Sequence, residues 1–304
     1  MAETTINSQS KRVSVVTGAN KGIGFEICRQ LASNGVQVVL TARDVKRGQE
    51  AVEKLKLSGL TDVIFHQLDV TDATSIASLA DFIEIQFGKL DILVNNAGVG
   101  GFTVIGENVK NLTFDYEHMF GSKVRDLNKF LEQTYESAEK CLKTNYYGIK
   151  QMSKALIRLL QKSDSPKMVN VSSNIGRLKL LTHQKARDEL GDVEGLTEEK
   201  VDKVVEEFLT DAKENLVETN GWPINFSAYN VSKAALNAYT RVLAKNHPNI
   251  AINAVGPGYT STDLNFNLGG HSAEEGAKGP VKLALSPEGG PSGLYFDQLE
   301  VSSF

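Results

Sequence analysis

A tyrosine and a lysine four positions apart, Tyr229 and Lys233, are the residues whose types and spacing first suggest chemistry. On a helix this spacing puts both side chains on one face, about one turn apart. A free phenol has a pKa of about 10 and is a poor proton donor or acceptor at neutral pH. A fixed ammonium group nearby would lower that pKa. The pair could therefore act as a general acid or base. The alternative is an exposed tyrosine beside a solvated lysine.

A second candidate is a glycine-rich turn near the start of the chain. Gly18, Gly22 and Gly24 follow a β-rich run at 13–17 and open a helical pattern that ends at Asn34-Gly35. Glycine lets the backbone approach a pyrophosphate, and the helix N-terminus offers free N–H groups. Between a strand and a helix this turn indicates a dinucleotide site, although the spacing is G-x-x-x-G-x-G. The alternative is a tight turn without a ligand.

The charges after the second expected strand bear on the choice of dinucleotide. Sites that prefer NAD usually hold an acid there, whereas Ala42 and Arg43 occupy that point in this chain, with Arg47 one turn further on. Lys21 lies inside the glycine turn. Arginine can clamp a 2′-phosphate, so the pattern favours NADP(H). These cations could instead be solvated, and Asp44 could be a displaced acid.

The surrounding pattern alternates strands and helices. Apolar runs at 13–17, 36–41, 63–68, 90–95, 167–171, 250–255 and 293–296 read as strands, and amphipathic segments lie between them. This spacing predicts βαβ units and an α/β, doubly wound Rossmann fold, with a seven-stranded, mostly parallel sheet flanked by helices. We expect one domain over 1–304, with a mobile tail at 1–11.

Composition excludes several classes of function. Hydrophobic residues make up 41% of the 304 residues, charged residues 23%, and the net charge is −4 without a basic stripe. We therefore expect neither a nucleic-acid nor a membrane partner. The first seven residues lack a signal-peptide pattern, and no apolar run reaches the roughly 20 residues of a membrane span, so we expect a cytoplasmic protein. The cysteines, Cys28 and Cys141, form no metal-ligand spacing, and we expect no metal.

Taken in order, the motifs resemble those of the short-chain dehydrogenase/reductase family over roughly residues 11 to 300. The family resemblance implies a catalytic set and a cofactor-binding set. The catalytic set is Asn145, Ser173, Tyr229 and Lys233. The cofactor set is Gly18, Asn20, Lys21, Gly22, Ile23, Gly24, Arg43, Arg47, Asp69, Val70, Asn96, Ala97, Gly98, Pro257, Gly258 and Thr262, together with Tyr229 and Lys233. More narrowly, the chain is similar to plant reductases of monoterpenoid and alkaloid ketones and to animal carbonyl reductases.

This resemblance implies hydride transfer from NADPH to a carbonyl. Tyr229 would protonate the oxygen, and Ser173 would hydrogen-bond it. Lys233 would hold the nicotinamide ribose, and Asn145 would hold a water that links Lys233 to solvent. The expected substrate is a hydrophobic cyclic ketone or an aldehyde. The alternatives are an alcohol dehydrogenase working in the oxidative direction, a reductase of conjugated C=C bonds, or an NADP(H) sensor without turnover.

Two separations along the sequence are longer than is usual in this family. Asn145 follows Asn95 by 50 positions, and Tyr229 follows Ser173 by 56. They predict insertions near 100–130 and 178–222, at strand ends where α/β ligand sites form. In the second, Val201, Val204, Val205, Phe208 and Leu209 form one helical face, which predicts a helix that packs on the domain and acts as a lid over the substrate. Because similar reductases with such insertions are monomers, we expect a monomer.

Several mostly apolar residues follow strand ends or border the insertions and are expected to contact the substrate. They are Phe102, Val104, Asn174, Ile175, Tyr259, Leu264 and Phe266. One residue near them departs from the pattern of similar plant enzymes, because Gly256 stands where those enzymes often carry a cysteine.

Overall fold

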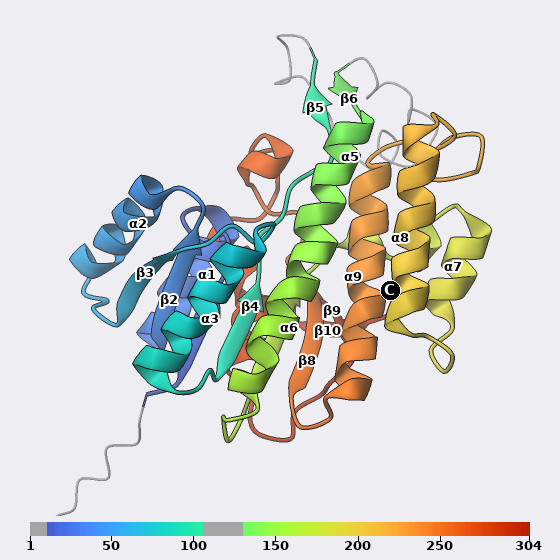
Figure 1. The fold of residues 1–304 in the computed structure, drawn as a ribbon. Helices are drawn as coiled ribbons and strands as arrows, with labels where there is room; N and C mark the ends of the chain where they lie inside the picture. The colour runs from blue at the N-terminus through green and yellow to red at the C-terminus, as the bar shows by residue number, and fades with distance from the viewer. Residues whose placement is uncertain (1–10, 106–129) are drawn as a thin grey trace, which may run out of the picture.

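The computed structural model describes residues 11–105 and 130–304 and is built on one large sheet between two layers of helices (Figure 1). The strand order is β10-β9-β8-β7-β4-β1-β2-β3, and all neighbours are parallel except β9 and β10. The strands are β1 (Val13–Val16), β2 (Gln37–Ala42), β3 (Val63–Gln67), β4 (Ile92–Asn95), β7 (Lys167–Val171), β8 (Ala251–Gly256), β9 (Tyr295–Asp297) and β10 (Glu300–Ser302). The central strands β1, β4 and β7 are buried throughout, because helices cover both faces of the sheet.

The helices form two layers with separate apolar cores. Helices α3 (Ala73–Phe87), α6 (Gly148–Leu160) and α9 (Ser227–Asn246) lie side by side on the face turned to the viewer in Figure 1. Helices α1 (Gly22–Ser33), α2 (Val45–Leu57) and α10 (Ala273–Ala284) pack their apolar residues into the core of the opposite face. The predicted Rossmann fold is therefore confirmed.

The sheet has one strand more than the sequence predicts. All seven expected strands are present, and β10 adds an antiparallel eighth strand at the edge. Its central residue, Val301, is 60% exposed, so β10 lacks the buried apolar run from which the others were inferred. Residues near the first predicted insertion add a two-stranded ribbon of β5 (Thr103–Val104) and β6 (Leu131–Glu132). The rest of that insertion, 106–129, lies outside the described residues, as does most of the expected tail at 1–11.

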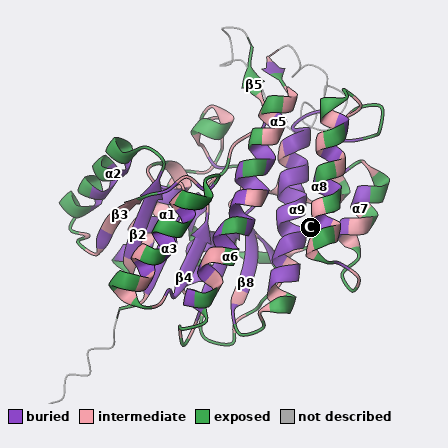
Figure 2. Cartoon of the chain, in the orientation of Figure 1, coloured by how far each residue is buried: buried purple, intermediate pink, exposed green. Residues whose placement is uncertain are grey.

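The second predicted insertion contains two helices, α7 (Gln184–Gly191) and α8 (Glu198–Lys213). The apolar stripe of α8 is buried as predicted, but against α9 and α5 (Tyr135–Leu142). Figure 2 shows α9 almost wholly buried beside α8, which has an exposed side. No residue of 178–222 lines the cavity described below, and a lid over the substrate stays a prediction.

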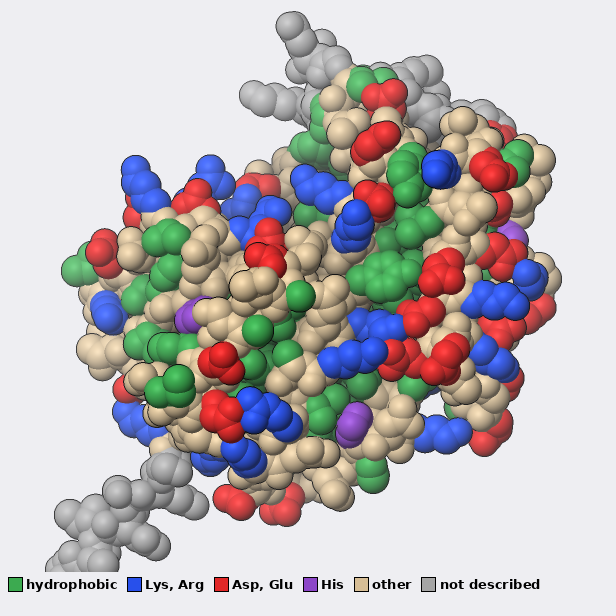
Figure 3. Space-filling model, viewed as in Figure 1, with side chains coloured by type: hydrophobic (Ala, Val, Ile, Leu, Met, Phe, Trp, Pro, Cys, Tyr) green, Lys and Arg blue, Asp and Glu red, His purple; other side chains and the backbone are tan. Residues whose placement is uncertain are grey.

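Charged side chains fasten α8 to α6. Lys150 of α6 donates to Asp202 at 2.7 Å and pairs with Glu198 at 2.8 Å, while the Tyr146 hydroxyl donates to Asp202 at 2.8 Å. In Figure 3 acidic and basic side chains alternate over this part of the surface without a patch of one sign. Ion pairs on the outside and an apolar stripe on the inside thus hold α8 on the domain.

The helix predicted at 143–160 begins earlier and is interrupted. It runs from α5 through a π-helical segment, Lys143–Tyr147, into α6. Such wide turns occur often at functional sites, and this one contains Asn145. A search of the described residues finds no helix long and apolar enough to cross a bilayer.

Candidate active site

A cavity of about 750 Å³ opens at the carboxyl ends of the parallel strands. It lies where the strand order reverses between β1 and β4, the point at which doubly wound sheets bind ligands. Nearly every residue predicted for the site lines it: Gly18, Asn20, Lys21, Gly22, Ile23, Gly24, Arg43, Asp69, Val70, Asn96, Ala97, Gly98, Phe102, Val104, Ser173, Ile175, Tyr229, Lys233, Pro257, Gly258, Tyr259, Thr262, Leu264 and Phe266. The exceptions are Arg47, Asn145 and Asn174.

The glycine turn has the geometry of a phosphate cradle. Gly18 and Gly22 have φ of +62° and +58°, which other residues rarely adopt. A Cβ at Gly24 would lie 2.5 Å from Asn96 Nδ2, and this amide donates to the Thr17 carbonyl at 2.9 Å. No side chain caps the first turn of α1, so its N–H groups face the cavity side of the turn and suit an anion. The residues present therefore fit a dinucleotide pyrophosphate.

Two of the three cations expected near a 2′-phosphate, Lys21 and Arg43, line the cavity. Arg43 is exposed and lines the cavity, whereas Arg47 does not line it. Lys21 forms an ion pair across the mouth of the cavity with Asp263, an acid that the sequence analysis did not single out. Asp44 accepts a hydrogen bond from the Arg47 amide at 2.9 Å and so caps α2. Asp44 does not line the cavity, so the structure does not favour it as the displaced acid.

Asp69 lies beside Arg43 at the end of β3. Its carboxylate accepts hydrogen bonds from the Thr71 amide at 2.9 Å and the Thr71 hydroxyl at 2.7 Å. Burial alone would raise the pKa of Asp69, but these bonds and the Arg43 charge outweigh it and lower the pKa. An ionised, fixed carboxylate therefore lines this end of the cavity.

The tyrosine and the lysine meet Ser173 at the other end of the cavity. The Ser173 side chain lies next to the Tyr229 hydroxyl, and Ser173 Oγ accepts from the Ile175 amide at 3.2 Å. Lys233 Nζ donates to the Val171 carbonyl at 2.8 Å and lies 5.6 Å from the centre of the Tyr229 ring. Ser173 follows β7, and Tyr229 and Lys233 belong to α9, which packs against β8 and against the 3-10 turn that Ser173 begins.

Burial shifts the pKa values of Tyr229 and Lys233 in opposite directions. It raises the pKa of Tyr229 to about 12 and lowers the pKa of Lys233 to about 8. The sequence-based expectation that the lysine lowers the tyrosine pKa left out desolvation, which is the larger effect here. At neutral pH Tyr229 is therefore a neutral phenol, able to donate a proton, and Lys233 is mostly protonated.

Asn145 lies behind the cavity wall and is fully buried. Its Oδ1 accepts from the Val99 amide at 2.8 Å, and its Nδ2 donates to the Val99 carbonyl at 2.9 Å and to Ser232 Oγ at 3.1 Å. The side chain thus joins the π-helical segment to the strand end that carries Gly98 and to α9. The water that the resemblance assigns to Asn145 stays a prediction.

The part of the cavity beyond Ser173 and Tyr229 is walled by aromatic rings. Phe102 packs against Phe226 at a ring-centre distance of 5.4 Å and against Phe266 at 6.2 Å. Leu131 and Leu268 belong to the same apolar cluster, which also contacts Tyr229. The site can therefore present an apolar surface next to a proton donor.

One predicted substrate residue points elsewhere, and several lining residues were missed. The side chain of Asn174 is bonded to β9 and does not line the cavity, because the turn after Ser173 directs it away. The missed residues are Leu68, Val99, Gly100, Thr144, Val171, Ser172, Thr260, Ser261, Asp263, Asn265 and Asn267. Many of them follow Pro257-Gly258 directly, so their position after a strand end was the available signal.

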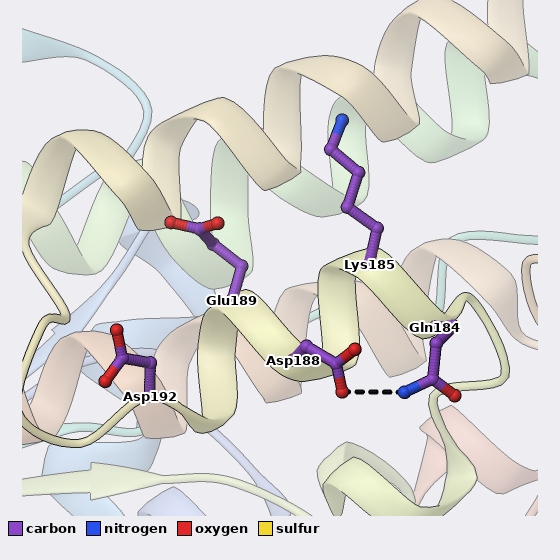
Figure 4. A pocket seen from close by; sticks show the side chains of 5 residues that line it. All are labelled: Gln184, Lys185, Asp188, Glu189 and Asp192. Carbon is purple, nitrogen blue, oxygen red and sulfur yellow. Dashed lines mark hydrogen bonds between the residues drawn. The ribbon is translucent and has the colours of Figure 1, made fainter.

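A second hollow on the surface lies along α7 and is lined by polar side chains (Figure 4). Its residues are Gln184, Lys185, Asp188, Glu189 and Asp192. Asp188 accepts from Gln184 at 2.6 Å, and Lys185 pairs with Glu207 at 2.8 Å. These side chains satisfy one another in solvent, and neither a glycine turn nor a buried proton donor adjoins them.

The larger cavity therefore follows the plan of a nicotinamide-dependent oxidoreductase of the Rossmann class, with phosphate-binding backbone at one end and proton-transfer groups at the other. A sequence model of short chain dehydrogenases matches residues 12–184 and 217–272. The chain belongs to the short-chain dehydrogenase/reductase family. The unmatched residues 185–216 contain α8, in the region where sequence spacing predicts an insertion.

Similar proteins include plant enzymes over almost their whole length. The structure of salutaridine reductase from Papaver somniferum is 53% identical, with a TM-score of 0.87, and covers 94% of this chain and 99% of that chain. Menthone neomenthol reductase from Mentha piperita is 47% identical, with a TM-score of 0.84, and covers 96% and 100%. The (−)-isopiperitenone reductase of Mentha piperita is 51% identical over 95% of this chain and 97% of its own length.

Proposed function

We propose that the protein is an NADPH-dependent reductase that converts the carbonyl of a hydrophobic cyclic ketone or an aldehyde into an alcohol. The observation that carries the proposal is that the Tyr229 and Ser173 side chains lie together at the apolar end of the cavity. A neutral phenol and a hydroxyl directed at one point can bind a carbonyl oxygen together. They can stabilise the negative charge that develops there during reduction.

The glycine turn and the N-terminus of α1 would hold the pyrophosphate, and Arg43 with Lys21 would hold the 2′-phosphate. Asp69 and Val70 would adjoin the adenine, and Pro257, Gly258 and Thr262 the nicotinamide amide. The cofactor, when bound, supplies a hydride to the carbonyl carbon. Three observations support this assignment: Arg43 and Lys21 are exposed, and the ionised Asp69 lies between β3 and α3.

Tyr229, Ser173 and Lys233 supply the proton and stabilise the substrate oxygen that receives it. Tyr229 donates its hydroxyl proton to the substrate oxygen, and Ser173 donates a hydrogen bond that fixes that oxygen. Lys233, held by the Val171 carbonyl, places an ammonium group near the phenol and favours its ionised form once the proton has left. Burial raises the pKa of Tyr229, so at neutral pH the phenol carries the proton that reduction of a carbonyl consumes.

The apolar wall supports a bulky hydrophobic substrate. Phe102, Phe226 and Phe266 form one aromatic surface, and Val104 and Leu264 border it. The relatives named above act, by their names, on salutaridine, menthone and isopiperitenone. For this chain we propose only the broader class of substrate, a plant terpenoid or alkaloid ketone.

A panel of carbonyl substrates tests the proposal. Menthone, isopiperitenone, an aromatic aldehyde and a morphinan ketone are incubated with NADPH, and the products are identified by mass spectrometry. An alcohol from at least one of them is expected. A saturated ketone from isopiperitenone would indicate reduction of the C=C bond instead, and turnover only of alcohols with NADP⁺ would indicate a dehydrogenase. NADPH binding without turnover of any compound would indicate a sensor.

The proposal includes a monomer in the cytoplasm. Because α8 covers α9 and α5, it occupies a helical face that a second copy would otherwise need. Sedimentation at micromolar concentration is expected to give the mass of one chain. A dimer or a tetramer would contradict the monomer without affecting the proposed reaction.

A further inference from the structure

The turn that follows Ser173 is tied to β9 by the side chain of Asn174 and, where the turn ends, by that of Arg177. Asn174 Nδ2 donates to Asp297 Oδ1 at 3.0 Å, and its Oδ1 accepts from the Tyr295 hydroxyl at 2.7 Å. The turn is a short 3-10 helix, Asn174–Gly176, and begins at the serine itself. The position of Ser173 therefore depends on a strand more than 120 positions away.

The opposite side of this turn rests on α9. Asn230 Nδ2 donates to the Ile175 carbonyl at 2.6 Å. A Cβ at Gly176 would lie 2.6 Å from the Lys233 backbone, so the turn packs directly on the helix that carries Tyr229. The turn is thus held between α9 and β9, and loosening one contact lets it shift toward the other.

Tyr295 itself is held rigidly. Its side chain is 2% exposed, and its ring packs edge-on against Phe304 at 6.4 Å. The Arg177 guanidinium lies 5.9 Å over the ring and donates to Asp297 Oδ2 at 2.7 Å. The phenol therefore has little freedom to move if its hydroxyl is displaced.

Gly256 leaves the space that this hydroxyl occupies. A Cβ at this position would lie 2.4 Å from Tyr295 Oη and 3.4 Å from both the amide nitrogen and Oδ1 of Asn174. The φ of Gly256 is not positive, so room and not backbone conformation requires glycine here. This gives a physical account of the residue that stands where similar plant enzymes often have a cysteine.

We propose that Tyr295 is a positioning residue for catalysis, whose hydroxyl fixes Asn174 and thereby aims Ser173 at Tyr229, and that Gly256 is the space that admits it. The inference rests on the proposed reduction, in which Ser173 orients the substrate oxygen. It predicts that residues 256 and 295 act as a pair: any side chain at 256 is harmful only while the hydroxyl at 295 is present.

The first test is Tyr295→Phe, which removes only the hydroxyl. A displacement of about 1 Å in a catalytic group can cost about 100-fold in rate. Loss of one of several restraints is expected to lower kcat about tenfold, and NADPH affinity should change less than about twofold. Tyr239→Phe is the matched control, because Tyr239 is fully buried and its hydroxyl has no partner among the described residues. Wild-type kcat in Tyr295→Phe would overturn the proposal.

The second test separates positioning from loss of stability. Gly256→Ala is made in the wild type and in Tyr295→Phe, and kcat and thermal unfolding are measured for all four proteins. In the wild type, Gly256→Ala should lower kcat about tenfold. In Tyr295→Phe it should change kcat less than about twofold, because the atom it would strike is gone. Equal losses in both backgrounds would overturn the pairing.

Crystal structures make the inference independent of turnover. In Tyr295→Phe and in Gly256→Ala, Asn174 and Ser173 should be displaced relative to the wild type, while they remain in place in Tyr239→Phe. A wild-type protein that reduces no carbonyl would refute the proposed function. Unmoved Ser173 in both variants would refute the positioning role alone.

Discussion

The side chains of Tyr229 and Ser173 lie next to each other in the wall of the cavity, although the two residues are 56 positions apart along the chain. The contact joins the end of β7 to the first turn of α9. It also sets where a carbonyl oxygen can sit, because both hydroxyls must reach it at once. The contribution of each hydroxyl to catalysis can be tested by removing it alone.

Tyr229→Phe is expected to lower kcat by at least about 10²-fold, because general-acid catalysis contributes about 10²–10⁴-fold. The ring still packs in the aromatic cluster, so folding and NADPH binding should persist. Initial rates with a ketone are compared with NADPH fluorescence titration. Tyr239→Phe serves as the control for removal of a buried hydroxyl, and undiminished turnover in Tyr229→Phe would reject the assignment of the acid.

Arg43→Ala is expected to weaken NADPH binding about tenfold or more and NADH binding less than about twofold, since a charge-assisted bond to the 2′-phosphate is lost and NADH has no such group. Dissociation constants for both nucleotides are measured by fluorescence titration. Arg47→Ala is the matched control, because Arg47 is exposed nearby but does not line the cavity. Similar losses for NADPH and NADH would exclude a phosphate-specific role.

Asp263→Asn is expected to strengthen NADPH binding by up to about fivefold at low salt. The ion pair between Asp263 and Lys21 spans the cavity mouth, and both side chains are more than half exposed, so the pair itself contributes little stability. Neutralising Asp263 frees Lys21 for the phosphate and removes a negative charge beside it. NADH binding, measured in parallel, should stay constant. Weaker NADPH binding would mean instead that the pair holds the loop in its binding conformation.

NADPH affinity is expected to fall as pH rises through about 8. Burial lowers the pKa of Lys233 to about 8, so the ammonium is present below that pH and lost above it, while Tyr229 stays neutral to about pH 12. Loss of the charge near the ribose should raise the dissociation constant about three- to tenfold between pH 7 and 9. In Lys233→Met the affinity should be lower and independent of pH in this range. A persisting step near pH 8 would assign it to another group.

Local motifs were predictable from the sequence, whereas side-chain directions were not. The glycine turn and the pair Tyr229 and Lys233 could be found because each lies within a few residues of a strand or helix signal. Asn174 was misplaced because its neighbour Ser173 faces the cavity, and only the turn between them decides that Asn174 does not. Tyr295 was missed because its partner is more than 120 positions away.

The same limit applies to α8. Its amphipathic pattern correctly indicated a buried face but carried no information on the surface that buries it. The surface is formed by α9 and α5, and Lys150 of α6 and Tyr146 of the π-helical segment bind the first turns of α8. A residue pattern on one element could not reveal a polar partner on another.

The bonds from Lys150 and Tyr146 to Asp202 are expected to stabilise the packing of α8 on the domain. Lys150 has a side chain only 10% exposed and shares Asp202 with the Tyr146 hydroxyl. Asp202→Ala leaves a buried ammonium with Glu198 as its remaining partner and leaves the phenol without its acceptor. We expect the free energy of unfolding to fall by about 2–4 kcal/mol, which is the range for breaking a buried, hydrogen-bonded ion pair. Urea unfolding is the measurement, and Glu206→Ala, an exposed acid on the same helix, should cost less than about 0.5 kcal/mol. Equal small effects would show that the apolar stripe alone holds α8 on α9.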